Sequence, residues 1–185
     1  MKRAIWGIGI LSLLASSSCI PTVHPLYSSD TLVESQLLEG RFSDEDSAQW
    51  QFRKELDHYY LVMNEHGKEA FFFVHLVQLD DYFYLDFFPD KVDALEINEF
   101  LLWHLLPVHL FARVEIHEDK LDLYFFDPQW LRVLLDERRI RIKHEQVMGN
   151  YLITASTEEL QKFVTKYGHL EEAYVESEPI VLNRS

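Results

Sequence analysis

The chain is short of residues that several classes of protein require. Among its 185 residues it has one cysteine, Cys19, and six glycines. A single cysteine cannot form a disulfide within the chain, so the core must stabilise the fold. The chain also lacks Gly-x-Ser-x-Gly, phosphate-loop and His-Glu-x-x-His motifs. These absences disfavour an enzyme, and a catalytic site built from scattered residues is the open alternative.

Basic residues are scarce as well. Lys and Arg number 17 against 31 Asp and Glu, and the formal net charge is −14. Nucleic-acid binding requires a basic surface, so no nucleic-acid partner is expected. Charge alone would not hold such a chain on an anionic membrane, and we interpret the acidity as a contribution to solubility.

The N-terminus has the order of segments that is typical of a secretory signal. Lys2 and Arg3 precede an uncharged apolar run at residues 4–15, and three serines lead from this run to Cys19. The run is shorter than the roughly 20 residues that a membrane-spanning helix needs. We therefore predict a signal peptide over residues 1–18, with cleavage before Cys19.

The position of Cys19 makes this segment resemble a bacterial lipoprotein signal, although Ser16 stands where such signals usually have leucine. The resemblance implies that lipid on the Cys19 thiol, palmitate included, anchors the chain in the cell envelope, facing the periplasm. Ile20 is not the aspartate that retains some lipoproteins in the inner membrane, which favours the outer membrane. The alternative is an ordinary signal peptide with an unmodified Cys19.

The remaining chain divides into three parts. Residues 19–37 have turn-forming residues and no hydrophobic periodicity, and are expected to be the lipidated cysteine and a tether. Residues 38–170 have enough aromatic residues for the core of one β-rich domain. Residues 171–185 are expected to be an acidic tail outside that domain.

Within residues 38–126 the hydrophobic pattern has a period of two. Residues 69–79 and 82–88 are rich in aromatic and branched side chains and are separated by Asp80-Asp81. Residues 108–116 alternate cleanly, and the alternation continues at residues 121–125. This pattern predicts an antiparallel meander of roughly seven to nine strands, either open or curled into a barrel, with short turns. The stretch 91–106 predicts a short helix or a packed loop.

Two helices are predicted near the C-terminus. Asp127 can cap the first, with Pro128 at its first position, and Ser156 and Glu159 form a capping box for the second. The run from Arg138 to His144 alternates basic and apolar residues like an edge strand. The predicted fold class is therefore β-rich α+β, an antiparallel meander sheet or partial barrel packed with two C-terminal helices.

Five short stretches are spread over most of the mature chain: Leu38-Glu39-Gly40, His75-Leu76, Leu85 to Pro89, Val108 to Phe111 and Leu152 to Gln161. They resemble an uncharacterised family of bacterial envelope lipoproteins. The resemblance implies an envelope location and no particular activity. The family usually has an aromatic residue after the glycine at Gly40, often as Gly-x-Trp, and this chain has Gly40-Arg41-Phe42.

His75, Asp86 and His109 form the candidate polar or metal cluster. Each is placed in a strand of the same predicted sheet, so neighbouring strands would bring two histidines and a carboxylate together. Such a set suits a divalent metal or a general acid–base pair. The alternative is that they are hydrogen-bonded structural residues. No catalytic residue and no cofactor are assigned, and the metal is left open.

Two other charged patterns have functional and structural interpretations. Aspartates at 80, 81, 86 and 90 could supply opposed carboxylates for sugar hydrolysis, but turn residues explain them better. The basic run from Arg138 to His144 could contact anionic headgroups or an acidic partner. We favour a charged edge strand that resists aggregation.

Three function hypotheses follow. The leading one is a lipid-anchored envelope protein with a non-catalytic binding or scaffolding role and an envelope protein as partner. The second is a lipocalin-like carrier that holds an apolar ligand inside a barrel. The third is a metal-dependent enzyme that uses His75, Asp86 and His109.

Overall fold

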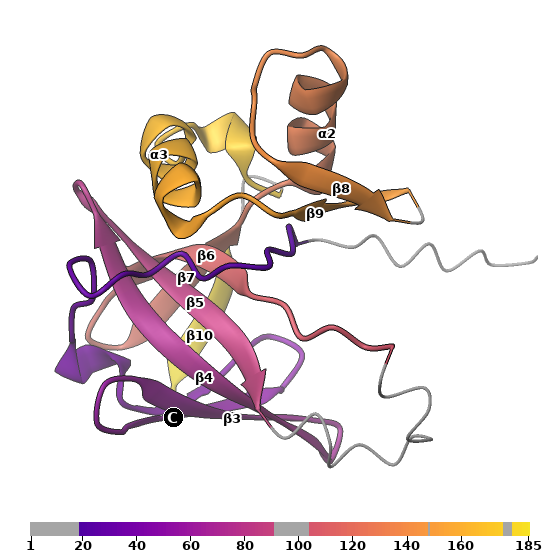
Figure 1. Ribbon diagram of the computed structural model, residues 1–185. Coiled ribbons are helices and arrows are strands. Elements are labelled where there is room, and N and C mark those ends of the chain that lie inside the picture. Colours follow the sequence, from indigo (N-terminus) through magenta and orange to yellow (C-terminus); the bar gives the residue numbers. More distant parts are fainter. Residues whose placement is uncertain (1–18, 91–103, 148, 176–178) are drawn as a thin grey trace, which may run out of the picture.

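The computed structural model describes residues 19–90, 104–147, 149–175 and 179–185, and its centre is a closed antiparallel barrel (Figure 1). Seven consecutive strands form a meander, and the last strand pairs with both β7 and β1 to close it. The barrel strands are β1 (Gly40–Ser43), β2 (Gln49–Lys54), β3 (Tyr59–Glu65), β4 (Lys68–Leu79), β5 (Tyr82–Asp90), β6 (Leu110–Ile116), β7 (Lys120–Phe125) and β10 (Ile180–Arg184).

A second layer covers one side of the barrel and confirms the β-rich α+β class (Figure 1). It contains α2 (Pro128–Asp136), α3 (Thr157–Tyr167) and a hairpin of β8 (His144–Val147) and β9 (Asn150–Ile153). Two short 3-10 helices are η1 (Gln36–Leu38) and η3 (Glu171–Ala173). The expected element at residues 91–106 lies mostly outside the described residues.

Two hydrophobic cores, one inside the barrel and one outside it, explain why some strands are apolar on both faces. On β4, Val74 and Leu76 join inward-facing residues from all eight barrel strands, whereas Val77 and Leu79 pack outward in a cluster with α2 and α3. Successive side chains of a strand point to opposite faces. A strand that is buried on both faces is therefore apolar throughout, as residues 71–79 largely are.

Both helices begin at the predicted capping residues. The Asp127 side chain accepts a hydrogen bond from the Gln129 backbone N–H at 2.8 Å, and Pro128 is the first residue of α2. Ser156 and Glu159 form the complete capping box of α3. These contacts satisfy N–H groups that a helix leaves unpaired in its first turn.

The predicted domain boundaries are wrong at the C-terminus. Residues 180–184 are not part of a loose tail, because they form β10, and Leu182 is fully buried inside the barrel. The alternation of Ile180 and Leu182 with Val181 and Asn183 is the strand signal in this stretch. Without β10, the edges of β1 and β7 would have no partner strand.

The predicted edge strand at residues 138–144 is also wrong. The structure has no strand at residues 138–143, and β8 begins only at His144. The alternation has another origin, because Ile140 and Ile142 are buried in the outer core while Arg139 and Arg141 are exposed. Protection of a sheet edge therefore does not explain these cations.

The expected tether is instead a packed segment, residues 20–35, which we call the strap (Figure 1). It crosses the outer face of the barrel, with Thr22 and Leu26 fully buried. Thr22 exchanges backbone hydrogen bonds with His109, both of 2.9 Å, and Val23 donates to the Ile153 carbonyl. The strap therefore joins the barrel to the β8–β9 hairpin.

Replacing Leu26 with alanine tests the packing of the strap. We expect a loss of about 2–5 kcal/mol in unfolding free energy, because a buried leucine leaves a cavity when it is shortened. Leu56→Ala is the matched control, since Leu56 is 97% exposed. Denaturant unfolding of both variants gives the comparison, and equal small losses would mean that the strap is a tether after all.

Candidate functional site

The three candidate site residues lie on the outer face of the barrel beneath the strap. His75 on β4 is the register partner of Asp86 on β5, and Asp86 is opposite Phe111 on β6. Paired residues of neighbouring strands share a face, and so do residues two apart in one strand. His109, two residues before Phe111, therefore comes to the same side. The predicted juxtaposition of the strands is present.

Asp86 and His109 form a direct, buried pair. Asp86 is completely buried, and its Oδ1 lies 2.7 Å from Nδ1 of His109, which is 7% exposed. Asp86 Oδ2 accepts a hydrogen bond from the Leu26 backbone N–H at 2.7 Å. A buried carboxylate needs such partners to offset its lost hydration. One Asp86 oxygen thus holds the strap directly, and the other holds His109, whose backbone pairs with Thr22 of the strap.

Helix α3 holds the same part of the strap from the other side. Thr157 donates a hydrogen bond to the Pro25 carbonyl at 2.8 Å, and Gln161 donates to the Leu26 carbonyl at 2.9 Å. The backbone at residues 25–26 is therefore fixed between β5 and α3. This clamp, with Asp86 at its centre, is a structural use of polar side chains.

His75 is in the cluster but makes a different contact. Its ring stacks on the Tyr27 ring of the strap, with 3.8 Å between the centroids. Its Nδ1 atom is buried and has no hydrogen-bond partner among the described residues. Burial lowers the pKa of His75, an effect that the nearby Asp86 charge partly opposes. Burial also raises the pKa of Tyr27. His75 is therefore held mainly as a neutral aromatic ring.

The lowered pKa of His75 predicts a pH effect on stability. Above its ordinary value of 6.5, His75 is neutral in both the folded and the unfolded states. Below that value the unfolded chain binds the proton first, so the unfolding free energy falls with falling pH until the folded protein is protonated as well. His75→Phe should flatten this part of the profile.

The measurement is denaturant unfolding at a series of pH values from 7 down to 5. His169→Phe is the control, because His169 is exposed. A wild-type slope that survives in His75→Phe would show that another group causes it.

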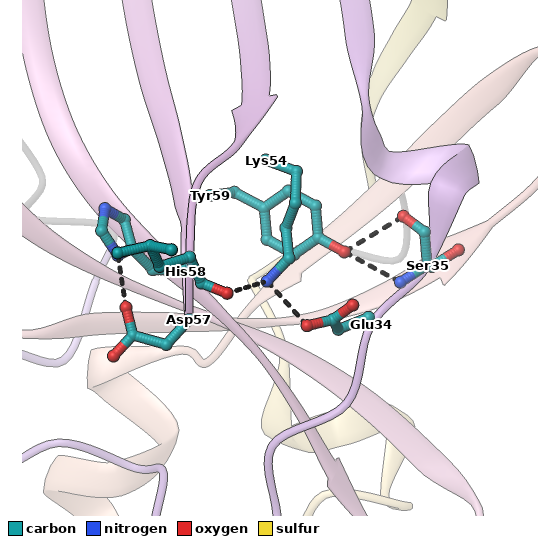
Figure 2. A network of polar contacts seen from close by, with 7 residues as sticks. Glu34, Ser35, Lys54, Asp57, His58 and Tyr59 are labelled. Atoms are coloured by element: carbon teal, nitrogen blue, oxygen red, sulfur yellow. Dashed lines mark hydrogen bonds and ion pairs between the residues drawn. The ribbon is translucent and has the colours of Figure 1, made fainter.

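The far end of the strap is fixed by a separate polar network (Figure 2). The Tyr59 hydroxyl accepts a hydrogen bond from the Ser35 N–H at 2.8 Å and donates to the Ser35 carbonyl at 3.1 Å. Lys54 and Glu34 form an ion pair of 2.8 Å. Beside them, His58 Nδ1 lies 2.9 Å from Asp57 Oδ1, and the His58 ring is 5.9 Å from that of His75. This network therefore extends the polar cluster of His75, Asp86 and His109 towards the β2–β3 turn.

A metal-type grouping occurs elsewhere in the described part of the chain. Ligand atoms of Glu115, His117 and Asp122 lie within 4.8 Å of one another on the β6–β7 hairpin. The register pair Glu115–Asp122 and the i, i+2 spacing of His117 are the signals that sequence reasoning missed. Lys120 Nζ lies 2.7 Å from Asp122 Oδ2, so a lysine ammonium already balances this carboxylate.

The centre of the barrel is crossed by aromatic side chains. The ring centroids of Trp50 on β2 and Phe87 on β5 are 6.4 Å apart, and those of Phe87 and Phe125 on β7 are 6.3 Å apart. Phe42 and Phe52 pack edge to face at 6.0 Å. Inward side chains of an eight-stranded barrel can either fill the interior or leave room for one small ligand. Here the rings from opposite walls meet.

None of the helices in the described ranges has both the length and the hydropathy needed to cross a bilayer. Comparisons of the chain with protein-family models, curated proteins and solved structures found no match.

Proposed function

We propose that this chain is a lipid-anchored protein of the bacterial cell envelope with a non-catalytic binding or scaffolding role. The lipid would be carried by Cys19, on the outer membrane, as the signal-like residues 1–18 and Ile20 suggest. The proposal includes membership of the envelope lipoprotein family that the short stretches resemble.

The observation that carries the proposal is that the chain is packed into the fold directly after Cys19. Ile20, directly after Cys19, is only 7% exposed, and Thr22 is fully buried. The expected mature N-terminus is therefore followed at once by residues that are packed against the rest of the fold. A lipid on Cys19 would therefore be attached directly beside the folded domain, without a linker, and would hold the domain close to the membrane.

The polar cluster supports the non-catalytic part of the proposal. A catalytic carboxylate and histidine must reach a substrate. Asp86 and His109 are instead covered by the strap, and both Asp86 oxygens accept hydrogen bonds. Asp86 and His109 bind Leu26 and Thr22 of the strap, and we therefore interpret both as structural residues.

The test of anchoring is metabolic labelling of the full-length chain in a bacterial host with an alkyne analogue of palmitate. We expect labelled wild-type protein in the membrane fraction, with a mature N-terminus at Cys19, and no label on Cys19→Ser. Ser17→Ala is the matched control and should be labelled. An unlabelled wild-type chain, or cleavage elsewhere, would refute the proposal. Density separation of the two membranes tests the outer-membrane location.

The closed barrel favours one second candidate, a carrier of an apolar ligand like the lipocalins. Such a carrier would have to displace the Trp50–Phe87 contact to make room. Native mass spectrometry of the mature chain with Cys19→Ser, which carries no covalent lipid and is purified without denaturation, decides between the two. Stoichiometric extra mass from a lipid would favour the carrier, and a bare chain mass would favour the scaffold.

A further inference from the structure

The neighbours of Cys19 form one identifiable surface. Cys19 lines a recess together with Pro128 and Arg132 of α2, Gly149 of the β8–β9 turn and Asn150 of β9. The hairpin and α2 lie together at the end of the molecule where the described chain begins (Figure 1). An anchor at Cys19 therefore brings this part of the fold nearest to a bilayer.

This surface has a charge opposite to that of the rest of the protein. We call α2, residues 137–143 and the hairpin β8–β9 the cationic layer, residues 128–153. It contains five Lys and Arg against three Asp and Glu. The other residues from Cys19 onward contain ten Lys and Arg against 28 Asp and Glu. An anionic bilayer would attract the layer and repel the remainder of the chain.

The local structure turns these cations outward. Ile140 and Ile142 are 8% and 9% exposed and fix the segment in the outer core, whereas the side chains of Arg139 and Lys143 are 61% and 73% exposed. Glu137 and Glu159 lie 3.4 and 3.8 Å from these two cations but are themselves about half exposed. Such exposed pairs are weak and leave the cations available to phosphate.

Two exposed apolar residues belong to the same layer. Val147, next to the turn of the hairpin, is 52% exposed, and Val133 on α2 is 49% exposed. Arg132 and Gly149, which line the recess with Cys19, are their close neighbours in the chain. Exposed apolar side chains beside cations are typical of surfaces that bind the membrane interface.

We propose that the cationic layer is the face that the anchored protein lays on an anionic bilayer. Its arginines and lysines contact lipid phosphates, and Val147 enters the interface beside the anchor. The acidic barrel then points away from the membrane, and its surface is presented to the surrounding space. This inference rests on the proposed anchoring at Cys19, and its test uses a different anchor.

The experiment replaces lipidation with a surrogate anchor. The mature chain with Cys19→Ser carries an N-terminal polyhistidine tag and is bound to phosphatidylcholine vesicles that contain nickel-chelating lipid, with or without phosphatidylglycerol. A single environment-sensitive fluorophore is attached at Val147→Cys. The control position is Asp81→Cys, in the β4–β5 turn, which projects on the opposite side from the hairpin in Figure 1. Nitroxide-labelled lipids serve as the quencher.

We expect several-fold stronger quenching at position 147 than at position 81 in vesicles with phosphatidylglycerol. The triple variant Arg139→Glu, Arg141→Glu and Lys143→Glu should abolish the difference. Reversal of Arg41 and Arg53, two exposed barrel cations, should not. Thermal unfolding of each variant checks that it is folded.

Equal quenching at the two positions, or quenching at 147 that survives the triple reversal, would overturn the inference. Because the tag replaces the lipid, this outcome does not depend on whether Cys19 is modified in cells. A failure of palmitate labelling therefore refutes the anchor alone, and a failure of quenching refutes the orientation alone.

Discussion

Replacing Asp86 with alanine should destabilise the protein by about 2–6 kcal/mol, because it leaves two buried hydrogen-bonding groups without their partner at a cost of roughly 1–3 kcal/mol each. The substitution leaves His109, 7% exposed, without its carboxylate partner. It also leaves the Leu26 N–H, which donates to Asp86 at 2.7 Å, without an acceptor. The clamp on the strap therefore loses its centre, and the strap should detach before the barrel unfolds.

Two measurements check this prediction. Denaturant unfolding gives the loss in free energy, with Asp81→Ala as the control, because Asp81 is exposed in the β4–β5 turn. Hydrogen exchange at residues 22–26 should become faster in Asp86→Ala while the barrel amides stay protected. A loss below about 1 kcal/mol, the range of ordinary surface substitutions, would show that Asp86 does not hold the strap.

The double variant Asp86→Ala and His109→Ala separates the two contacts of Asp86. If the histidine contributes most of the effect, the double variant should be hardly less stable than Asp86→Ala. If the Leu26 N–H contributes most, Asp86→Asn should retain part of the stability, because an amide oxygen still accepts that bond.

Replacing Phe52 with alanine is expected to have a comparable effect by another mechanism. Phe52 is 1% exposed inside the barrel and packs against Phe42 and Trp50. Shortening a buried phenylalanine to alanine costs about 3–5 kcal/mol, from lost transfer free energy and from the cavity. Phe83→Ala is the matched control, because Phe83 is 37% exposed on β5.

The cavity itself gives a second readout. An apolar cavity stays dry and can bind a small apolar molecule such as benzene. Benzene should therefore raise the unfolding midpoint of Phe52→Ala and leave that of the wild type unchanged. A wild-type shift of the same size would mean that the barrel already has room for a ligand, and would favour the carrier over the scaffold.

The pairing of His75 with Asp86 could be predicted because it depends on a local turn. Asp80 and Asp81 connect β4 to β5 directly, so residues equidistant from the turn must face each other. Turn geometry sets the register of a hairpin. The position of His109 could not be derived in this way, since the connection from β5 to β6 is long and has no such register. Its contact with Asp86 depends on how the barrel closes.

The strap shows the limit of sequence reasoning most clearly. Its contacts join residues far apart in the chain: Leu26 and Asp86 are separated by 60 in residue number, and Pro25 and Thr157 by 132. No periodicity marks a segment that is held by individual hydrogen bonds rather than by a repeated apolar face. The turn-forming residues that indicated a tether predict a local backbone conformation, and they give no information about tertiary contacts.

The sequence by itself determined the class of fold, the capped helices and most of the strands, because alternation and capping are properties of neighbouring residues. It also marked Cys19 as the candidate anchor. Only the tertiary structure decided that β10 closes the barrel, that the strap covers Asp86 and His109, and that the cations of residues 138–143 lie in the layer next to Cys19. Each of these features depends on long-range contacts. The entropy cost of closing the long loops between them is offset only by the contacts of the whole assembled barrel.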